Sequence, residues 1–148
     1  MPSYEARITI AAPSADVWRV LSDVVAWPQW LQTVVSVRAL DAEPLAEGNR
    51  YEIRQPHLRR AIWVVTSLAP LRRFVWRSRS PGFSMIADHV IDARPSYQTH
   101  VTVRFSFSGW LGTPVGLMYR SLTHIYLAQE TAALKRKVEG AHPGSHPG

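Results

Sequence analysis

Residues 73–108 read RFVWRSRSPGFSMIADHVIDARPSYQTHVTVRFSFS, which is three runs of alternating residues separated by two turn signals. Alternation of apolar and polar residues with a period of two is typical of a half-buried β-strand. The turn signals are Pro81-Gly82 and Pro95-Ser96. Because no helical pattern lies between the runs, they should pair antiparallel in chain order. The strands predicted from these runs are 73–79, 83–93 and 98–108.

Four further runs read as strands, at residues 4–10, 33–40, 49–55 and 61–68. The run 61–68 is apolar on both faces, so its parity is ambiguous, and we favour Trp63, Val65 and Ser67 as inward. Two short helices fit between the first two of these strands. Ser14 is a preferred N-cap residue, and the apolar residues after it have helical spacing over 15–23. Pro28 fits the first position of a second short helix or turn near Trp27 and Trp30. The sequence therefore predicts seven strands, with two short helices after the first.

The last long element is a helix over about 114–139, which would be roughly 37 Å long at 1.5 Å per residue. Thr113 can cap this helix, Pro114 suits its first turn and Gly140 can end it. In this α+β order one face of the sheet needs a cover, and the helix is the only element long enough to provide it. A strongly curved sheet wrapped around the helix would leave an internal cavity. The expected apolar side of the helix is Met118, Leu122, Ile125, Tyr126, Leu134 and Val138.

Length and composition are those of one globular domain. The chain has 148 residues, of which 46% are hydrophobic and 19% charged, and this balance excludes a disordered chain. We expect a single domain over 1–140 and a flexible tail over 141–148, where the sequence is low in complexity. No apolar run reaches the ~20 residues that cross a bilayer and no signal peptide is visible, so we expect a cytoplasmic protein.

Cofactor and metal chemistry find no support in the sequence. The absence of cysteine excludes disulfides and thiolate ligands, and the six histidines have no metal-ligand spacing. There is also no glycine-rich phosphate loop and no motif of a serine hydrolase or a zinc protease. We therefore expect no metal site and no cofactor.

The formal charge of +6 comes almost entirely from arginine, since only two of the seventeen cations are lysines. Two interpretations stay open: peripheral contact with an anionic membrane, or the coding bias of a GC-rich genome. Nucleic-acid binding is disfavoured, because alternation puts Phe74 and Trp76 on the face opposite the neighbouring arginines. The densest group of arginines is Arg59, Arg60, Arg72, Arg73, Arg77 and Arg79.

Residues 10–30, IAAPSADVWRVLSDVVAWPQW, resemble the first motif of the polyketide cyclase/dehydrase group. This group belongs to the START-like, helix-grip (SRPBCC) superfamily, which shares its fold with the birch-pollen allergens. Gly48 before the third strand, the Pro70 turn and residues 128–139, AQETAALKRKVE, agree with the resemblance, which covers about 3–139. It implies a curved antiparallel sheet around the C-terminal helix and a cavity between them. Members of this superfamily bind lipids, hormones, polyketides or quinones, and some are enzymes while others are carriers.

Strand parity selects the side chains that would face the cavity. The inward set is aromatic with few polar groups, as in the walls of small-molecule pockets. Alternatively these residues fill the core and leave no space, but the family resemblance favours a cavity. Its mouth should lie near Trp27, Trp30 and the Pro81-Gly82 turn. The candidate ligand-binding residues are Tyr51, Trp63, Phe74, Trp76, Phe83, Met85, His89, Phe105, Phe107, Met118, Tyr119, Leu122 and Tyr126.

His89 is the most informative polar residue, because nothing else on its face exchanges a proton near neutral pH. It can orient a ligand or act as an acid or base; alternatively, it is bonded to a backbone carbonyl or a tyrosine hydroxyl. No acidic residue has a clear inward position on the strands, so a pair of histidine and carboxylate is not evident. Glu130 on the helix is the one candidate, and it can equally be solvated. Three tyrosines are alternative hydroxyl donors: Tyr51, Tyr119 and Tyr126.

These features favour a carrier or sensor that binds a hydrophobic small molecule (lipid-, polyketide- or aromatic-like) in the internal cavity. The alternative is a polyketide cyclase/dehydratase-type enzyme, with His89 or an inward tyrosine as acid or base. A third possibility is an interaction protein that uses its arginine-rich outer strands at a membrane surface or on a partner. The chain can be a monomer or a homodimer.

Overall fold

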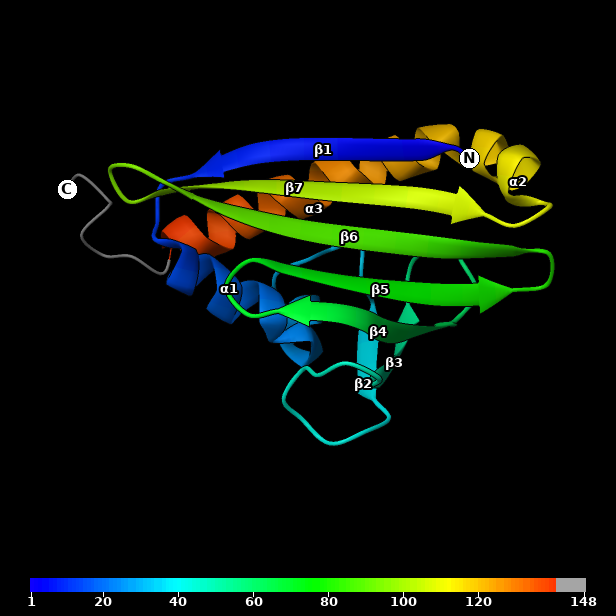
Figure 1. Ribbon diagram of the computed structural model, residues 1–148, viewed down its shortest axis with the longest axis horizontal. Coiled ribbons are helices and arrows are strands. Elements are labelled where there is room, and N and C mark those ends of the chain that lie inside the picture. The colour runs from blue at the N-terminus through cyan, green and yellow to red at the C-terminus, as the bar shows by residue number, and fades with distance from the viewer. Residues whose placement is uncertain (141–148) are drawn as a thin grey trace.

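A computed structural model describes residues 1–140, and the expected tail over 141–148 lies outside the described residues. One seven-stranded antiparallel sheet curves around a long C-terminal helix, and two short helices follow the first strand (Figure 1). This arrangement confirms the predicted α+β helix-grip architecture. The elements are β1 (Ser3–Ile10), α1 (Ser14–Ser22), the 3-10 helix η1 (Val24–Gln29), β2 (Ser36–Ala39), β3 (Arg50–Arg54), β4 (Ala61–Ala69), β5 (Arg73–Ser80), β6 (Phe83–Arg94), β7 (Gln98–Ser108), α2 (Gly112–Met118) and α3 (Arg120–Gly140).

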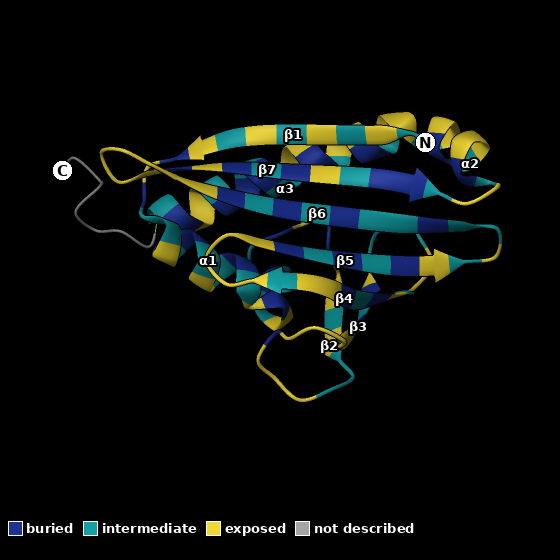
Figure 2. Ribbon diagram, in the orientation of Figure 1, coloured by how far each residue is buried: buried dark blue, intermediate teal, exposed yellow. Residues whose placement is uncertain are grey.

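The sheet is a meander from β2 to β7, with β1 added beside β7. Its order is β1-β7-β6-β5-β4-β3-β2, and every neighbouring pair is antiparallel. In Figure 1, β5, β6 and β7 run across the view while β2 and β3 stand upright, because the sheet is strongly twisted and curved. Exposed residues alternate with partly buried ones along β1, and buried residues alternate with more exposed ones along β5, as period-two patterning requires (Figure 2).

The first helix begins without the predicted cap. Ser14 is the first residue of α1, Pro13 occupies the N-cap position, and no side chain caps the helix. Pro28 lies inside η1, near its end, rather than at its first position. The residue before it, Trp27, is 3% exposed, and its indole N–H donates a hydrogen bond of 3.0 Å to the carbonyl oxygen of Leu21. The tryptophan-rich segment is therefore part of the core.

The second strand is shorter than predicted. Of residues 33–40, only Ser36–Ala39 pair as β2. Thr33 and Val34 are buried in the turn after η1, where the Val34 N–H donates to the carbonyl of Leu31 at 3.2 Å. Both side chains are buried although they lie outside a strand. The sequence pattern alone does not distinguish such a buried turn from a buried strand.

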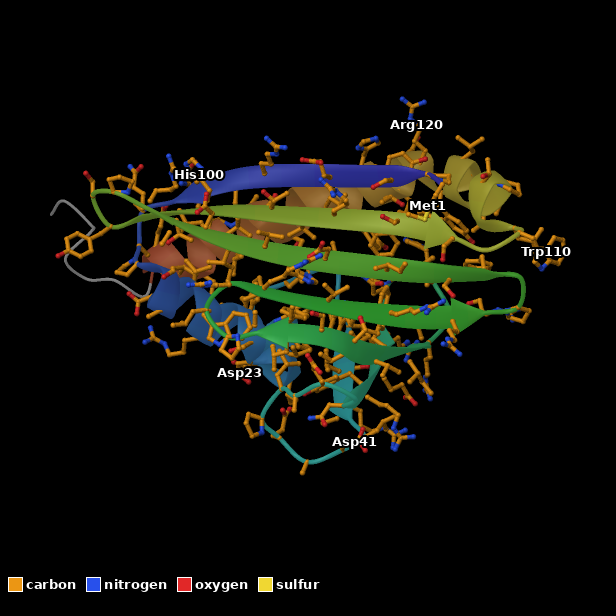
Figure 3. The ribbon with its side chains drawn as sticks, viewed as in Figure 1. Met1, Asp23, Asp41, His100, Trp110 and Arg120 are labelled. Atoms are coloured by element: carbon orange, nitrogen blue, oxygen red, sulfur yellow. The ribbon has the colours of Figure 1, made fainter. Side chains whose placement is uncertain are left out.

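The predicted C-terminal helix is two helices, α2 and α3, with a break at Tyr119. A close contact fixes α2: a Cβ atom on Gly116 would lie 2.6 Å from the Cβ of Pro2. The hydroxyl of Tyr4 also donates a hydrogen bond of 2.9 Å to the Gly116 carbonyl. The N-terminal strand thus holds α2 at its own angle to α3. In the turn before α2, Trp110 is 81% exposed and projects from one end of the molecule (Figure 3).

The inward face of the helix is rotated from the predicted one. Met118 and Ile125 are 71% and 52% exposed, whereas Thr123 and Thr131 are buried. The threonine hydroxyls are satisfied within the helix, where they donate to the carbonyls of Tyr119 and Leu127 at 2.8 and 3.0 Å. These two threonines therefore lie on an otherwise apolar face of the helix. The buried stripe is Thr123, Leu127, Thr131, Leu134 and Val138.

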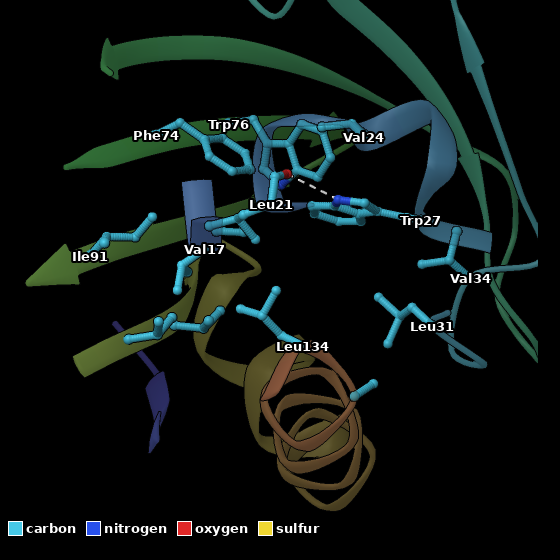
Figure 4. Close-up of a cluster of buried hydrophobic side chains, with 14 of the residues drawn as sticks. Val17, Leu21, Val24, Trp27, Leu31, Val34, Phe74, Trp76, Ile91 and Leu134 are labelled. Atoms are coloured by element: carbon cyan, nitrogen blue, oxygen red, sulfur yellow. Dashed lines mark hydrogen bonds between the residues drawn. The ribbon is translucent and has the colours of Figure 1, made fainter. Parts of the chain in front are cut away.

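The packed core lies at the α1 end of the space between sheet and helix. There Val17 and Leu21 of α1, with Trp27, pack between β5 and Leu134 of α3 (Figure 4). Four rings contact one another in this region, those of Trp27, Phe74, Trp76 and His89. The Phe74 ring stacks on His89 with ring centroids 4.2 Å apart. Within residues 1–140, no helix is both long and apolar enough to cross a bilayer. The opposite end of the space between sheet and helix is not filled in this way.

Candidate functional site

A cavity of about 630 Å³ lies between the concave face of the sheet and the first half of α3. Its floor consists of inward side chains of β4–β7, and its roof consists of residues between Tyr119 and Glu130. The volume falls within the ~300–1,000 Å³ of pockets that hold drug-sized molecules. Polar wall residues are few beyond the rim, and they include Ser78 and Thr123.

The cavity opens where β4 and β5 separate. Their ladder ends at Val64 opposite Arg77, and the residues beyond this pair are not bonded across the two strands. The two segments that no longer pair with each other, residues 61–63 of β4 and 78–80 of β5, both line the cavity. The β3–β4 loop, residues 57–60, forms the adjoining part of the rim. The exposed lining residues Arg59, Arg60 and Arg79 lie beside this separation of the strands, so we take it as the entrance.

Eight of the thirteen predicted residues line this cavity. They lie on three strands, at the break before α3 and in the first turns of α3. The inward parity predicted for β4, β6 and β7 places the strand residues there. They are Trp63, Phe83, Met85, Phe105, Phe107, Tyr119, Leu122 and Tyr126.

Three predicted residues line neither this cavity nor the smaller space described below. Met118 ends α2 and is 71% exposed, because the break at Tyr119 turns it outward. Tyr51 and Phe74 are fully buried, but they fill the core with Trp76 beside them. Tyr51 and Phe74 point inward as predicted, but they lie in the packed core and not in the cavity wall.

The remaining two predicted residues, Trp76 and His89, line a second, small space of about 40 Å³. This inner chamber shares Trp63, Phe105 and Glu130 with the main cavity, so it adjoins the cavity behind these side chains. A water molecule needs about 10–15 Å³ by the same measure, so the chamber has room for one or a few waters. The polar groups of His89 and Thr33 line it as well.

His89 and Glu130 form a pair that the sequence did not make evident. Nε2 of His89 lies 3.2 Å from Oε1 of Glu130. The histidine side chain is 2% exposed and the glutamate side chain 17% exposed, so water screens the pair weakly. The other ring nitrogen, Nδ1, is buried without a hydrogen-bond partner among the described residues. His89 therefore has one bonded nitrogen and one nitrogen available to a water or a ligand.

The two members of the pair face different spaces. Glu130 lines both the main cavity and the inner chamber, whereas His89 lines only the chamber. A molecule in the main cavity would therefore meet the carboxylate directly and the imidazole behind it. Such a pair can hold a proton between its members, and it can accept a hydrogen bond from a hydroxyl group.

The predicted mouth near Trp27 and Trp30 is wrong. Trp27 packs against Trp76, with ring centroids 5.3 Å apart, and closes that end of the interior. The turn at Pro81-Gly82 was placed better, because Ser80 and Phe83 on either side of it line the cavity.

Three tyrosine hydroxyls were alternatives to His89, and the structure separates them. Tyr126 donates a hydrogen bond of 2.6 Å to the carbonyl of Pro56, which ties α3 to the β3–β4 loop, and burial raises the pKa of Tyr126. Tyr51 donates to Glu43 at 3.0 Å, away from the cavity. Burial raises the pKa of Tyr51 to about 12, and the bond to Glu43 adds to the increase. Tyr119 and Tyr126 face the cavity, and Tyr51 does not.

The group of six arginines is not one patch. Arg72 precedes β5 and Arg73 begins it, and Arg73 forms a bidentate ion pair with Asp88. Arg79 lies at the other end of the strand, ~20 Å away at about 3.3 Å per residue. There it joins Arg59 and Arg60 at the rim of the cavity. Sequence proximity grouped side chains that the extended strand separates.

Several wall residues were not among the predicted ligand-binding residues. The rim loop has no periodicity, and Ser78 and Thr123 are polar residues that a search for apolar faces passes over. One signal was present: Ser78 has the same parity as Phe74 and Trp76.

A family model described as "Polyketide cyclase / dehydrase and lipid transport" matches residues 1–139. The chain belongs to this polyketide cyclase/dehydrase family. Its match spans every strand and α3 up to its last residue but one. The cavity described above is thus the interior of a member of the polyketide cyclase/dehydrase family. No curated protein sequence matches the chain.

Solved structures similar to this family member share its fold. A START superfamily protein from Mycobacterium smegmatis has a TM-score of 0.77 at 19% identity, with 95% of this chain and 99% of that chain covered. The Zhui aromatase/cyclase from Streptomyces sp. R1128 has a TM-score of 0.78 at 15% identity, with 98% of each chain covered. The di-domain ARO/CYC BexL from the BE-7585A biosynthetic pathway has a TM-score of 0.70 at 20% identity, and the match covers 94% of this chain but 47% of BexL. At these identities the likeness establishes the fold.

Proposed function

We propose that the protein binds a hydrophobic small molecule in the main cavity, as a carrier or sensor. The observation that carries this proposal is the cavity of about 630 Å³ beside a fully packed core. Protein interiors normally contain few voids larger than a water molecule, so a space of this size is a feature that the packing preserves. Its aromatic floor suits a lipid-, polyketide- or aromatic-like ligand.

Native mass spectrometry of the purified protein tests the proposal first, since a co-purified ligand adds a discrete mass. Fluorescence titration with a pyrene probe, 4-(1-pyrenyl)butanol, tests it independently. We expect saturable binding, because pyrene is an apolar aromatic body small enough for the cavity. The absence of both a bound mass and saturable binding would refute the proposal.

A pair of variants shows whether the probe occupies this cavity. Ser78 lines the cavity and is 2% exposed, whereas Thr66 is exposed on β4. Ser78→Leu should weaken probe binding about tenfold or more, because forcing extra atoms into occupied space costs ~1–3 kcal/mol. Thr66→Leu adds a comparable volume outside the cavity and should leave binding unchanged. Equal effects of the two substitutions would place the probe elsewhere.

The pair of His89 and Glu130 favours a second candidate, a cyclase/dehydratase-type enzyme. In this candidate Glu130 takes a proton from a carbon beside a ligand carbonyl, and His89 stabilises the carboxylate from the inner chamber. Tyr119 lines the same cavity and can donate to the carbonyl. The pair supports this chemistry because it puts a proton acceptor inside an apolar space.

Exchange of a carbon-bound proton tests the enzyme candidate without knowledge of the substrate. A naphthyl 1,3-diketone in D₂O has an acidic CH₂ group, and NMR measures its replacement by deuterium. An enzyme should accelerate this exchange, and Glu130→Gln should slow it by at least ~10²-fold while binding is retained. In a carrier, the protein adds no exchange, and His89→Phe changes binding of a polar-headed ligand by only ~0.5–1.5 kcal/mol. The two candidates thus predict different results for the same measurement.

A further inference from the structure

Three arginines surround the entrance of the main cavity. Arg59 and Arg60 lie in the β3–β4 loop, and Arg79 lies on the end of β5 across the gap in the sheet. All three are exposed, so their guanidinium groups remain in water at the rim while their stems line the wall.

These rim arginines differ from most exposed arginines of the molecule in lacking a close acidic partner. Within residues 1–140, neither Arg59 nor Arg79 has a carboxylate within 4 Å, and Arg60 reaches Glu52 only at 3.8 Å. The same Glu52 accepts a hydrogen bond of 2.9 Å from Arg38, so its interaction with Arg60 is the weaker of the two. Within residues 1–140 most of the other exposed arginines pair with an acid, such as Arg73 with Asp88 at 2.6 Å. The exceptions are Arg54, Arg72, Arg120 and Arg136. Arg59 and Arg79 therefore give the rim positive charge that no described carboxylate within 4 Å neutralises.

The other end of the cavity has the opposite character. Glu130 lines the end that adjoins the inner chamber, where the arginines do not reach. Its carboxylate would repel an anion that entered with its charged end first. Between the two ends the wall is mainly aromatic and aliphatic, so it suits an apolar body. The cavity thus has one end that attracts an anion and one that repels it.

We propose that the ligand is an anionic amphiphile, whose apolar body fills the cavity while its acidic group stays at the rim against Arg59, Arg60 and Arg79. The acidic group is a carboxylate or a phosphate, since both accept the paired N–H donors of a guanidinium. This inference rests on the proposed binding function and adds the class and the orientation of the ligand. Any hydroxyl at the far end of the body would donate to Glu130.

Matched probes measure the preference directly. The probes are 4-(1-pyrenyl)butanoate, the neutral 4-(1-pyrenyl)butanol and the phosphate monoester of that alcohol, which share one apolar body. Fluorescence titration at low salt should give at least about tenfold tighter binding of an anionic probe than of the alcohol. A higher affinity of the carboxylate or of the phosphate identifies the acidic group. Raising the salt concentration should weaken binding of the anions and leave the alcohol unaffected.

Two triple variants of equal charge change show where the preference arises. The first replaces Arg59, Arg60 and Arg79 with glutamine, and the control replaces Arg72, Arg94 and Arg136, which are exposed away from the rim. The rim variant should bind all three probes equally, with the affinity for the alcohol within about twofold of wild type. The control should retain the tenfold preference.

Each outcome decides a different statement. Equal affinity of wild type for acid and alcohol overturns the anionic ligand while the binding function stands. Equal loss of preference in both triple variants also overturns it, because net charge rather than the rim would then attract the anion. Failure of all three probes to bind contradicts the proposed function itself. If the rim variant does not fold, the single substitutions Arg59→Gln and Arg79→Gln, compared with Arg72→Gln, decide whether the preference arises at the rim.

Discussion

Nε2 of His89 lies 3.2 Å from Oε1 of Glu130, and this contact joins the middle of the sheet to α3. Both side chains are largely buried, so the loss of either one leaves the other unpaired in a region of low dielectric. The first prediction concerns the energy of this contact.

A double-mutant cycle with His89→Phe and Glu130→Gln should give a coupling energy of about 1–3 kcal/mol in urea unfolding. Phe can keep the stack on Phe74, so the cycle isolates the polar contact. The same cycle on Arg73 and Asp88, a surface ion pair, serves as control and should give less than about 1 kcal/mol. Additive effects of the two substitutions at His89 and Glu130 would contradict the prediction.

Trp63 is the largest of the four side chains that line both the main cavity and the inner chamber, with Gln55, Phe105 and Glu130. Trp63→Ala should join the two spaces and lower the free energy of unfolding by ~3–5 kcal/mol, as expected for truncation of a buried tryptophan. Wider polycyclic probes should bind the variant better than wild type. Trp110→Ala is the control, because Trp110 is 81% exposed and its loss should change stability by at most ~0.5 kcal/mol. Unchanged selectivity for probe width would show that Trp63 does not limit the cavity.

Tyr126 and Tyr4 make comparable hydrogen bonds to backbone carbonyls, at 2.6 Å to Pro56 and 2.9 Å to Gly116. Replacing either with Phe should cost about 1 kcal/mol of stability. Only Tyr126→Phe should accelerate amide hydrogen exchange in the β3–β4 loop and the release of a bound probe, because its bond holds that loop at the rim. Hydrogen exchange and stopped-flow fluorescence measure the two effects. Equal loop exchange in both variants would show that the bond does not restrain the rim.

Alkaline stability should depend on Tyr51. Its pKa of about 12 in the folded chain lies above the value of ~10 expected in the unfolded chain. Folding therefore favours the neutral phenol, and this contribution is fully present below about pH 10 and disappears as the pH rises through about 12. The unfolding free energy should fall by on the order of 2 kcal/mol over this interval, and Tyr51→Phe should remove most of the fall. Tyr97→Phe, at a residue that is 80% exposed, should leave the pH dependence unchanged. Identical alkaline profiles for wild type and Tyr51→Phe would exclude this role.

Strand placement was predictable because it depends on local alternation. The parity of β6 and β7 alone placed Met85, His89 and Phe105 inward, and the structure agrees. Within a strand, a single correct register decides the direction of every side chain.

The helical half of the site was less accessible to sequence reasoning. The break at Tyr119 depends on contacts of Gly116 with Pro2 and Tyr4, which are more than a hundred residues away in the chain. Each residue turns a helix by about 100°, so the position of the break decides whether Met118 or Tyr119 faces inward. The pairing of Glu130 with His89 depends on the same rotation. No local pattern contains that information.

The division of α3 has a consequence for how this protein can change over generations. The part after Glu130 carries Leu134 and Val138, which pack into the core and stabilise the fold. The part before Glu130 carries Leu122 and Tyr126, which shape the cavity together with Tyr119 at the break before the helix. Substitutions in the first part of the helix therefore alter what fits inside while the residues that secure folding stay the same. Descendants of this protein can therefore change the ligand that they bind through single substitutions in the cavity wall, because each intermediate sequence keeps the residues that stabilise the fold.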